Sequence, residues 1–329
     1  MSFALAGLAA CEHAQPFNAV SGEPNVPFDT TFPRQLTFSA SADLEPSWLP
    51  DGSGIIYTFA RGTPDNDRCL AILPAKGGHQ LRTMCPTPVA NDADSANTLW
   101  EPAVGPGGVL AYVRESSLPG DLAPKSRELV VASLDAPDPG RAVVSFPYLG
   151  SDGQFRDDAS HLHWQGGDTL VYLAEQVNYI TNGVHADTVT IPLEIVRVDL
   201  TGASPVRTVV PGTANAMSLT VDSSGALIYT LLGDTHVYRL PRAGGAAAVL
   251  YDFGSAGVPS EVQVSGKVLV AMIGGSLITA TVGDTVVTSI PSPNTAQQVR
   301  RPALSPSGAR VVIELGGSRP ADLWLLQVP

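Results

Sequence analysis

Residues 45–57 read EPSWLPDGSGIIY, and this stretch carries the pattern that decides the fold. It contains a short strand, a turn at Pro50-Asp51-Gly52 and a second, apolar strand. In such a turn Pro presets φ, Asp bonds its own backbone and Gly accepts a positive φ. Isoleucine and tyrosine favour extended backbone on the far side of the turn. The stretch therefore predicts a β-hairpin.

The same pattern recurs five more times along the chain. Residues 301–313, RPALSPSGARVVI, are the most similar copy. The other four are EPAVGPGGVLAY from Glu101, HLHWQGGDTLVYL from His161, SLTVDSSGALIYTL from Ser218 and EVQVSGKVLVAM from Glu261. Successive copies begin 40–60 residues apart, and a second pair of strands usually follows each one. This period, with two hairpins per unit, predicts an all-β fold, a six-bladed β-propeller over residues 34–329.

The two ends of the repeat region complement each other. After the sixth copy the chain supplies a third strand, ADLWLLQV, but no fourth, so the last blade lacks its outer strand. Residues 33–38, PRQLTF, precede the first copy without a partner of their own. Placing them on the last blade closes the ring and covers an exposed sheet edge. We expect Leu36 and its neighbours to pair beside Leu323 to Leu326.

Composition limits the classes of partner. The chain has 329 residues and a formal net charge of −12, with 19 basic residues against 31 acidic ones. Such a surface repels phosphate backbones, so we expect no nucleic-acid binding. No stretch sustains the i, i+3, i+4, i+7 apolar pattern of a long helix.

The N-terminal residues resemble an export signal. Residues 3–10 are apolar but too short to span a bilayer. Residues 8–11, LAAC, resemble the lipobox of bacterial lipoproteins, which implies lipidation of Cys11. No Lys or Arg precedes the apolar run. Two interpretations therefore stay open: the true start lies upstream of Met1, or the segment is not a working signal. We expect residues 1–11 to be a residual signal and 12–33, with four prolines, an extended tether.

The other two cysteines bracket a predicted hairpin. Cys69 and Cys85 lie on either side of a turn at residues 76–78. Their placement makes a disulfide geometrically reasonable, and an exported compartment would permit it. Two reduced thiols are the alternative.

The repeats also resemble a known family. The pattern P-x-W-x-P-D-G-x-x-I-x-Y in residues 46–57, with Arg-Gln-Leu-Thr at 34–37, is similar to the WD40-like (PD40) repeat of TolB-type propellers. The resemblance covers residues 33–329, strongly in the first and sixth copies and weakly in the third to fifth. It implies a protein- or peptide-binding platform in the cell envelope.

Alignment of the copies brings one set of polar residues together. The position that opens each innermost strand is polar in all six copies: Glu45, Glu101, His161, Ser218, Glu261 and Arg301. Innermost strands line the central channel, so these residues are candidate ligand contacts at its mouth. The glutamates and His161 could hold a divalent cation or polarise a substrate. A hydrated mouth with offsetting charges is the structural alternative.

Other candidate motifs are weak or absent. The His161-x-His163 pair lacks a third ligand at fixed spacing, so no metal site is assigned. Trp48 and Trp164 occupy the same repeat position, where the other copies have Val or Leu, which indicates core packing between blades. The sequence has no G-x-S-x-G, P-loop or H-E-x-x-H motif.

Three functions follow from these observations. The first is an exported binding platform for a protein or peptide, in the periplasm or on the outer surface, lipid-anchored or secreted. It would be a monomer that meets the membrane only through its N-terminal anchor. The second is a hydrolase or lyase with a metal-assisted site at the channel mouth. The third is a purely structural surface protein. We favour binding over catalysis because no catalytic motif is present.

Overall fold

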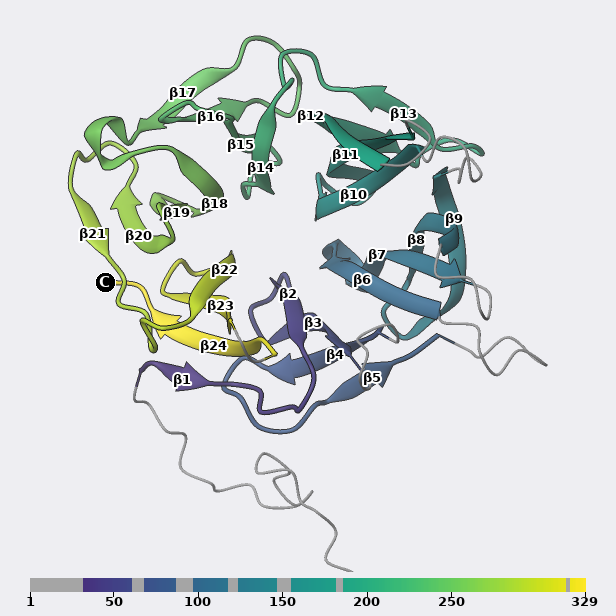
Figure 1. Cartoon of the computed structure of the whole chain (residues 1–329), viewed down its shortest axis with the longest axis horizontal. Helices are drawn as coiled ribbons and strands as arrows, with labels where there is room; N and C mark the ends of the chain where they lie inside the picture. The colour runs from purple at the N-terminus through teal and green to yellow at the C-terminus, as the bar shows by residue number, and fades with distance from the viewer. Residues whose placement is uncertain are drawn as a thin grey trace, which may run out of the picture.

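Six four-stranded antiparallel sheets surround a central channel in the computed structural model of the chain (Figure 1). The structure describes residues 32–60, 68–86, 97–117, 124–146, 155–181, 186–317 and 320–329. Within these ranges the only helices are two 3-10 turns, Pro106–Gly108 and Gly254–Ala256. The predicted all-β, six-bladed propeller is confirmed.

Each blade is a meander whose first strand lies at the channel and whose last lies at the rim (Figure 1). Blade 1 consists of β2 (Asp43–Trp48), β3 (Gly54–Ala60), β4 (Arg68–Pro74) and β5 (Arg82–Met84). Blade 2 consists of β6 (Asn97–Val104), β7 (Val109–Ser117), β8 (Pro124–Ser133) and β9 (Ala136–Phe146). Blade 3 consists of β10 (Phe155–Trp164), β11 (Thr169–Thr181), β12 (Ala186–Asp199) and β13 (Val206–Val209). Blade 4 consists of β14 (Ala216–Val221), β15 (Leu227–Leu231), β16 (His236–Leu240) and β17 (Ala248–Asp252). Blade 5 consists of β18 (Pro259–Ser265), β19 (Val268–Ile273), β20 (Ser276–Thr281) and β21 (Val287–Ser289). Blade 6 consists of β22 (Gln298–Leu304), β23 (Arg310–Gly316), β24 (Asp322–Gln327) and, from the other end of the chain, β1 (Arg34–Gln35).

The N-terminal strand closes the ring as the sequence predicts. Arg34 pairs with Leu325 and Gln35 with Trp324 in an antiparallel ladder. The N–H of Leu36 then donates to the carbonyl of Leu323 at 2.7 Å. Leu36 is 1% exposed, so the closing strand also contributes a side chain to the core.

The core is a set of apolar clusters shared between neighbouring blades. One cluster contains Leu36, Trp48, Ala303 and Leu325, and so joins blade 1 to blade 6. The indole N–H of Trp48 donates to the carbonyl of Ala303 at 2.8 Å. Trp164 makes the equivalent bond to the carbonyl of residue 103 in blade 2, at 3.1 Å. The prediction that both tryptophans pack between blades is confirmed.

A disulfide joins Cys69 in β4 to Cys85 just after β5, with an S–S distance of 2.08 Å. It links the two outer strands of blade 1, so the predicted pairing is confirmed.

The N-terminal predictions stay predictions. Cys11, the residual signal and most of the tether lie outside the described residues. No helix in the part that the structure describes is long and apolar enough to cross a membrane.

Two carboxyl groups lie beside the ring closure. Asp43 is 1% exposed and accepts a hydrogen bond from Ser39 Oγ at 2.8 Å. Burial raises the pKa of Asp43 to about 7; bonds from Thr37 and Ser39 lower it, and the nearby charge of Asp322 raises it. Burial likewise raises the pKa of Asp322 to about 6. Ionising these groups therefore opposes closure.

Asp43→Asn should stabilise the protein at alkaline pH. The pKa of Asp43 is about 4 in the unfolded chain and about 7 in the folded protein. Its contribution to the free energy of unfolding is therefore fully present below about pH 4 and is lost as the pH rises through about 7. Asparagine is never charged, so the melting temperature at pH 8 should rise by roughly 2–4 °C, the shift that about 1 kcal/mol produces. At pH 4.5 the difference should nearly vanish. Asp135→Asn, at a side chain 98% exposed, is the control and should change neither value. An equal effect of Asp43→Asn at both pH values would contradict the assignment.

Candidate functional site

Each innermost strand breaks register with its neighbour at or just before the predicted channel-mouth position. In blade 1 the break lies between Leu44 and Ser47, so Glu45 and the residue after it fall outside the ladder. Four of these positions have left-handed backbone: Glu45 (φ 54°), Glu101 (φ 49°), His161 (φ 52°) and Arg301 (φ 44°). A β-bulge of this kind re-aims a side chain. Residues other than glycine rarely adopt left-handed backbone, and those that do are frequent at functional sites.

Carboxylates of one blade bond the bulged backbone of the next. The N–H of Glu45 donates to Glu314 Oε1 at 2.5 Å. The N–H of Glu101 donates to Glu45 Oε2 at 2.8 Å, and the N–H of His161 donates to Glu101 Oε2 at 3.0 Å. Glu45 Oε2 also accepts from Thr58 Oγ1 at 2.8 Å. The acids thus satisfy backbone donors that the bulges leave without a ladder partner.

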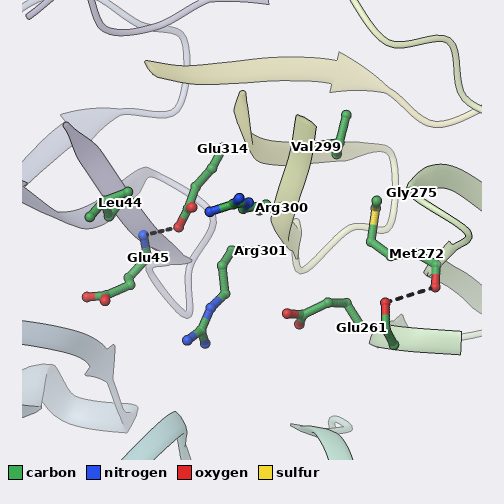
Figure 2. A pocket seen from close by; sticks show the side chains of 10 residues that line it. Leu44, Glu45, Glu261, Met272, Gly275, Val299, Arg300, Arg301 and Glu314 are labelled. Atoms are coloured by element: carbon green, nitrogen blue, oxygen red, sulfur yellow. Dashed lines mark hydrogen bonds between the residues drawn. The ribbon is translucent and has the colours of Figure 1, made fainter. Parts of the chain in front are cut away.

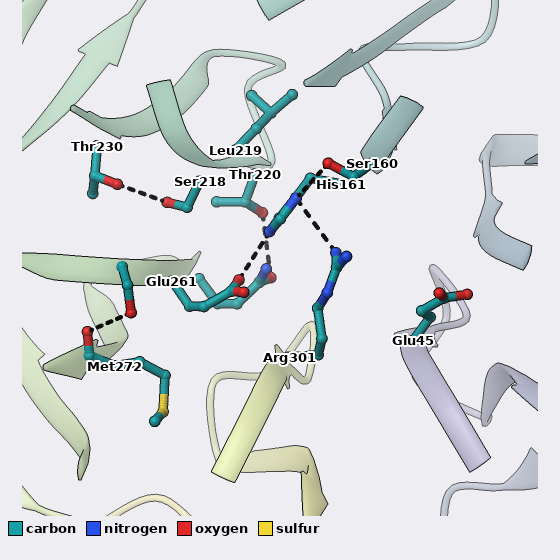
Figure 3. Close-up of polar contacts among 12 residues, drawn as sticks. Glu45, Ser160, His161, Ser218, Leu219, Thr220, Thr230, Glu261, Met272 and Arg301 are labelled. Carbon is teal, nitrogen blue, oxygen red and sulfur yellow. Dashed lines mark hydrogen bonds and ion pairs between the residues drawn. The ribbon is translucent and has the colours of Figure 1, made fainter. Parts of the chain in front are cut away.

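Arg301 and His161 connect blades across the channel (Figure 3). Arg301 Nη2 pairs with Glu101 Oε1 at 2.7 Å, and its Nη1 lies 3.3 Å from His161 Nδ1. Because arginine can only donate, Nδ1 is the acceptor and the imidazole proton lies on Nε2. Nε2 then donates to Glu261 Oε2 at 2.9 Å. We call Glu45, Glu101, His161, Glu261 and Arg301 the polar ring.

Burial shifts the acid–base behaviour of these groups. It raises the pKa of Glu101 to about 7, although Arg301 acts in the opposite direction. It raises the pKa of Glu314 to about 7 as well, against the bond from the Glu45 N–H. For Glu261 burial also acts upward, but His161 and Arg301 together hold its pKa below the usual range. Arg301 has a raised pKa because the carboxylates, Glu101 first, outweigh its own burial.

The polar ring is the floor of a cavity of about 820 Å³, which we call the funnel. Its walls include Trp48, Trp164, Val221, Val264 and Leu304. This volume and mixture, an apolar wall with a few convergent polar groups, is typical of ligand sites.

A second cavity of about 360 Å³, the small cavity, is lined by Glu45, Glu261, Arg301 and seven other residues (Figure 2). It reaches Gly275 in the β19–β20 turn, whereas the funnel reaches Lys267 in the β18–β19 turn. Successive turns of a meander lie at opposite ends of its strands, so the two cavities open toward opposite faces. Glu45, Glu261 and Arg301 line both.

Five of the six predicted ring positions meet at the channel, and Ser218 does not. In blades 4 and 5 the register break comes just before the ring position. The long side chain of Glu261 still reaches the channel. Ser218 is fully buried, lies 3.1 Å from Thr230 Oγ1 and lines neither cavity.

Two further residues complete the picture. His163 lines the funnel, but its Nε2 bonds the carbonyl of Leu219 at 3.0 Å and burial lowers its pKa to about 4. Glu314 in β23 was not predicted, yet it is 4% exposed and lines the small cavity. Its signal in the sequence is one acid inside the apolar run RVVIELG.

The channel residues do not fit a divalent-cation site. Among the described residues, no group of three or more His, Cys, Asp or Glu side chains is arranged to hold a metal ion. Arg301 lies among the carboxylates that would have to supply the ligands, and Glu101 uses both oxygens on protein donors.

Comparisons with known proteins find similar folds among solved structures. No protein-family model matches the sequence, and a search of curated proteins finds no match. Solved structures do match: an oligogalacturonate lyase in complex with manganese is 14% identical with a TM-score of 0.54, over 90% of this chain and 79% of that chain. A gluconolactonase from Xanthomonas campestris is 14% identical with a TM-score of 0.54, over 90% of each chain. TolB from Acinetobacter baumannii is 16% identical with a TM-score of 0.49, over 87% of this chain and 63% of that chain. The chain is similar to β-propellers. These likenesses show the fold alone, because proteins of this architecture differ in function.

Arg301→Met should destabilise the protein in a pH-dependent way. It leaves Glu101 buried without its cation, a loss of about 3–5 kcal/mol in the free energy of unfolding at pH 8. At pH 5.5 the loss should be smaller, because a carboxyl with a pKa of about 7 then takes up a proton. Urea unfolding at both pH values measures the difference.

Two variants test the cause. Adding Glu101→Gln to Arg301→Met should recover part of the stability at pH 8. Arg82→Met, which breaks an exposed pair with Asp135, should cost no more than about 1 kcal/mol. A pH-independent loss without recovery would show that Arg301 acts by packing alone.

Proposed function

We propose that the protein is a binding platform of the cell envelope and that the funnel receives a peptide segment of a partner protein. The observation that carries this proposal is the polar ring. Its charged groups bond one another and the backbone N–H groups of Glu101 and His161, so the funnel ends on a fixed polar floor. Such a floor orients a ligand without ordering side chains at the moment of binding, which favours affinity.

The funnel walls suit an extended peptide. Three prolines at its rim, Pro50, Pro106 and Pro306, belong to the inner turns of three blades. Proline has few conformations to lose, and the valines and tryptophans below offer apolar contact. Hydrogen bonds to the polar ring at the bottom of the funnel would then fix the direction in which the peptide binds.

Export and membrane attachment are part of the proposal. The Cys69–Cys85 disulfide supports an oxidising compartment, since such bonds are rare in the reducing cytosol. The LAAC sequence at residues 8–11 supports a lipid on Cys11. A tether of about twenty residues would hold the disc close to a membrane.

One observation favours an enzyme as the second candidate. The pKa of Glu101, raised to about 7 by burial, is suited to proton transfer near neutral pH. Two structural neighbours, a lyase and a lactonase by name, are enzymes. Both oxygens of Glu101 are already bonded within the protein, so we place this candidate second. Turnover that Glu101→Gln abolishes would reverse the order.

Site-specific photo-crosslinking in living cells tests the platform. p-Benzoylphenylalanine at Lys267 or Ser223, both exposed at the funnel, should give a discrete adduct with one partner. The same group at Val249 or Leu232, which are 54% and 65% exposed but away from the funnel, should not. Adducts of equal yield at all four positions, or none at the funnel, would contradict the proposal.

Metabolic labelling tests the anchor. Cells fed an alkyne-bearing palmitate analogue should label the wild-type protein, and Cys11→Ser should remove the label and release the protein into the soluble fraction. The Cys69→Ser/Cys85→Ser double variant controls for labelling of other thiols and should keep the label. Label that persists in Cys11→Ser would rule out lipidation at this residue.

A further inference from the structure

The small cavity contains a buried acid that the fold does not fully use. Glu314 is 4% exposed and lies in the second strand of blade 6. It pairs with Arg300, just as Thr58 in blade 1 pairs with Leu44, the residue before the ring position. Blade 1 therefore builds the same position with an uncharged side chain.

Within the described part of the chain, only one oxygen of Glu314 has a hydrogen-bond partner. Oε1 accepts from the N–H of Glu45, whereas Oε2 accepts no hydrogen bond from any described residue. The side chain lines the small cavity (Figure 2). It is not among the residues that line the funnel. The residue is thus almost entirely enclosed, while its second oxygen stays open to a hydrogen-bond donor that enters the small cavity.

Other lining groups point to the same chemistry. Glu261 contributes a second carboxylate whose Oε1 has no partner within the described part of the chain. Two arginines line the cavity as well: Arg301 bonds Glu101 and His161, and Arg300 bonds Gln298 Oε1 at 2.5 Å. The acids outnumber the arginines at this cavity, because Glu45 lines it together with Glu261 and Glu314.

The shape and charge of the cavity select among cations. Leu44, Met272 and Val299 supply apolar surface beside the acids. The two guanidinium groups oppose a compact divalent ion, and no three-ligand group is present among the described residues. An ammonium on a short alkyl chain needs only two or three acceptors and can place its methylenes on the apolar side.

We propose that the small cavity binds a primary alkylammonium group, held by Glu314 and Glu261, with its alkyl chain against Met272 and Val299. The same chemistry is found in a small free amine and in the end of a lysine side chain. This site opens on the face opposite the funnel, so it stands even if the funnel receives no partner.

Methionine-methyl NMR gives a direct test. n-Butylammonium should shift the methyl signal of Met272 saturably and leave that of Met84, buried in a different cluster, unchanged. The Met272→Leu variant assigns the signal. n-Butyrate, which has the same alkyl chain and the opposite charge, should cause no saturable shift.

Variants locate the binding group. Glu314→Gln should weaken the amine at least about tenfold, the loss expected when a charged hydrogen-bond partner is removed. Glu314→Thr adopts the side chain of blade 1 and should do the same if the Gln variant folds poorly. Asp135→Asn removes one negative charge at an exposed position and should leave the affinity unchanged.

Several results would overturn the proposal. These are no saturable shift with n-butylammonium, equal binding of n-butyrate, or equal affinity in Glu314→Gln and Asp135→Asn. Calcium or manganese chloride that displaces the amine at stoichiometric concentration would assign the cavity to a metal instead. Binding of a blocked Gly-Lys-Gly peptide would identify a polypeptide as the source of the ammonium, and binding of the free amine alone would identify a small molecule.

Discussion

The pairing of β1 with β24 is the constraint on which the rest of the structure depends. Blades of a propeller contact their neighbours in a circle, so every interface requires that the last blade be complete. Two ladder pairs and the Leu36 N–H bond provide this join, with the Leu36 side chain buried beneath them. Without the join, blade 6 would expose an edge and the Trp48 indole would lose its position against Ala303. The cross-channel bonds of Arg301 span several blades, so they too need a closed circle.

The polar ring places charge where a propeller is narrowest. Burial disfavours ionisation there, and it raises the pKa of Glu101 in the ring and of Glu314 beside the ring. Arg301 offsets part of this penalty, and backbone N–H groups of the bulges offset a further part. Buried charge of this kind is weak support for stability and better support for a specific arrangement. The ring therefore fixes geometry at the channel at some cost in stability.

The architecture could be predicted from the sequence because local chemistry determines it. The Pro50-Asp51-Gly52 turn specifies a hairpin, and the spacing of its copies specifies the blades. The closing strand could be predicted because residues 33–38 lack a partner near the start of the repeats, while the last blade lacks its outer strand. These signals are short-range or complementary, so no knowledge of packing is needed.

The site could be predicted only in part, since it depends on side-chain direction. Alignment of the repeats identifies the polar ring positions, but it does not predict the bulges that turn their side chains inward. One signal for the bulge in blade 1 is Pro46, because proline cannot donate a hydrogen bond to the strand ladder. Ser218 aligned with the others, but its short side chain bonds Thr230 instead of reaching the channel. Glu314 belongs to a different strand and joins the site only through tertiary contact. Pairings between distant blades, such as Arg301 with Glu101, are set by rotamers that repeat alignment does not contain.

The partition between the two cavities has a thermodynamic consequence. Glu45, Glu261 and Arg301 face both spaces, so a molecule that draws any of these side chains toward one face changes the hydrogen bonds offered at the other. Linkage makes such an effect reciprocal: whatever factor one occupant imposes on the affinity of the second, the second imposes on the first. A disc only one strand-length thick can thus transmit the occupancy of one side to the other without any movement of its blades.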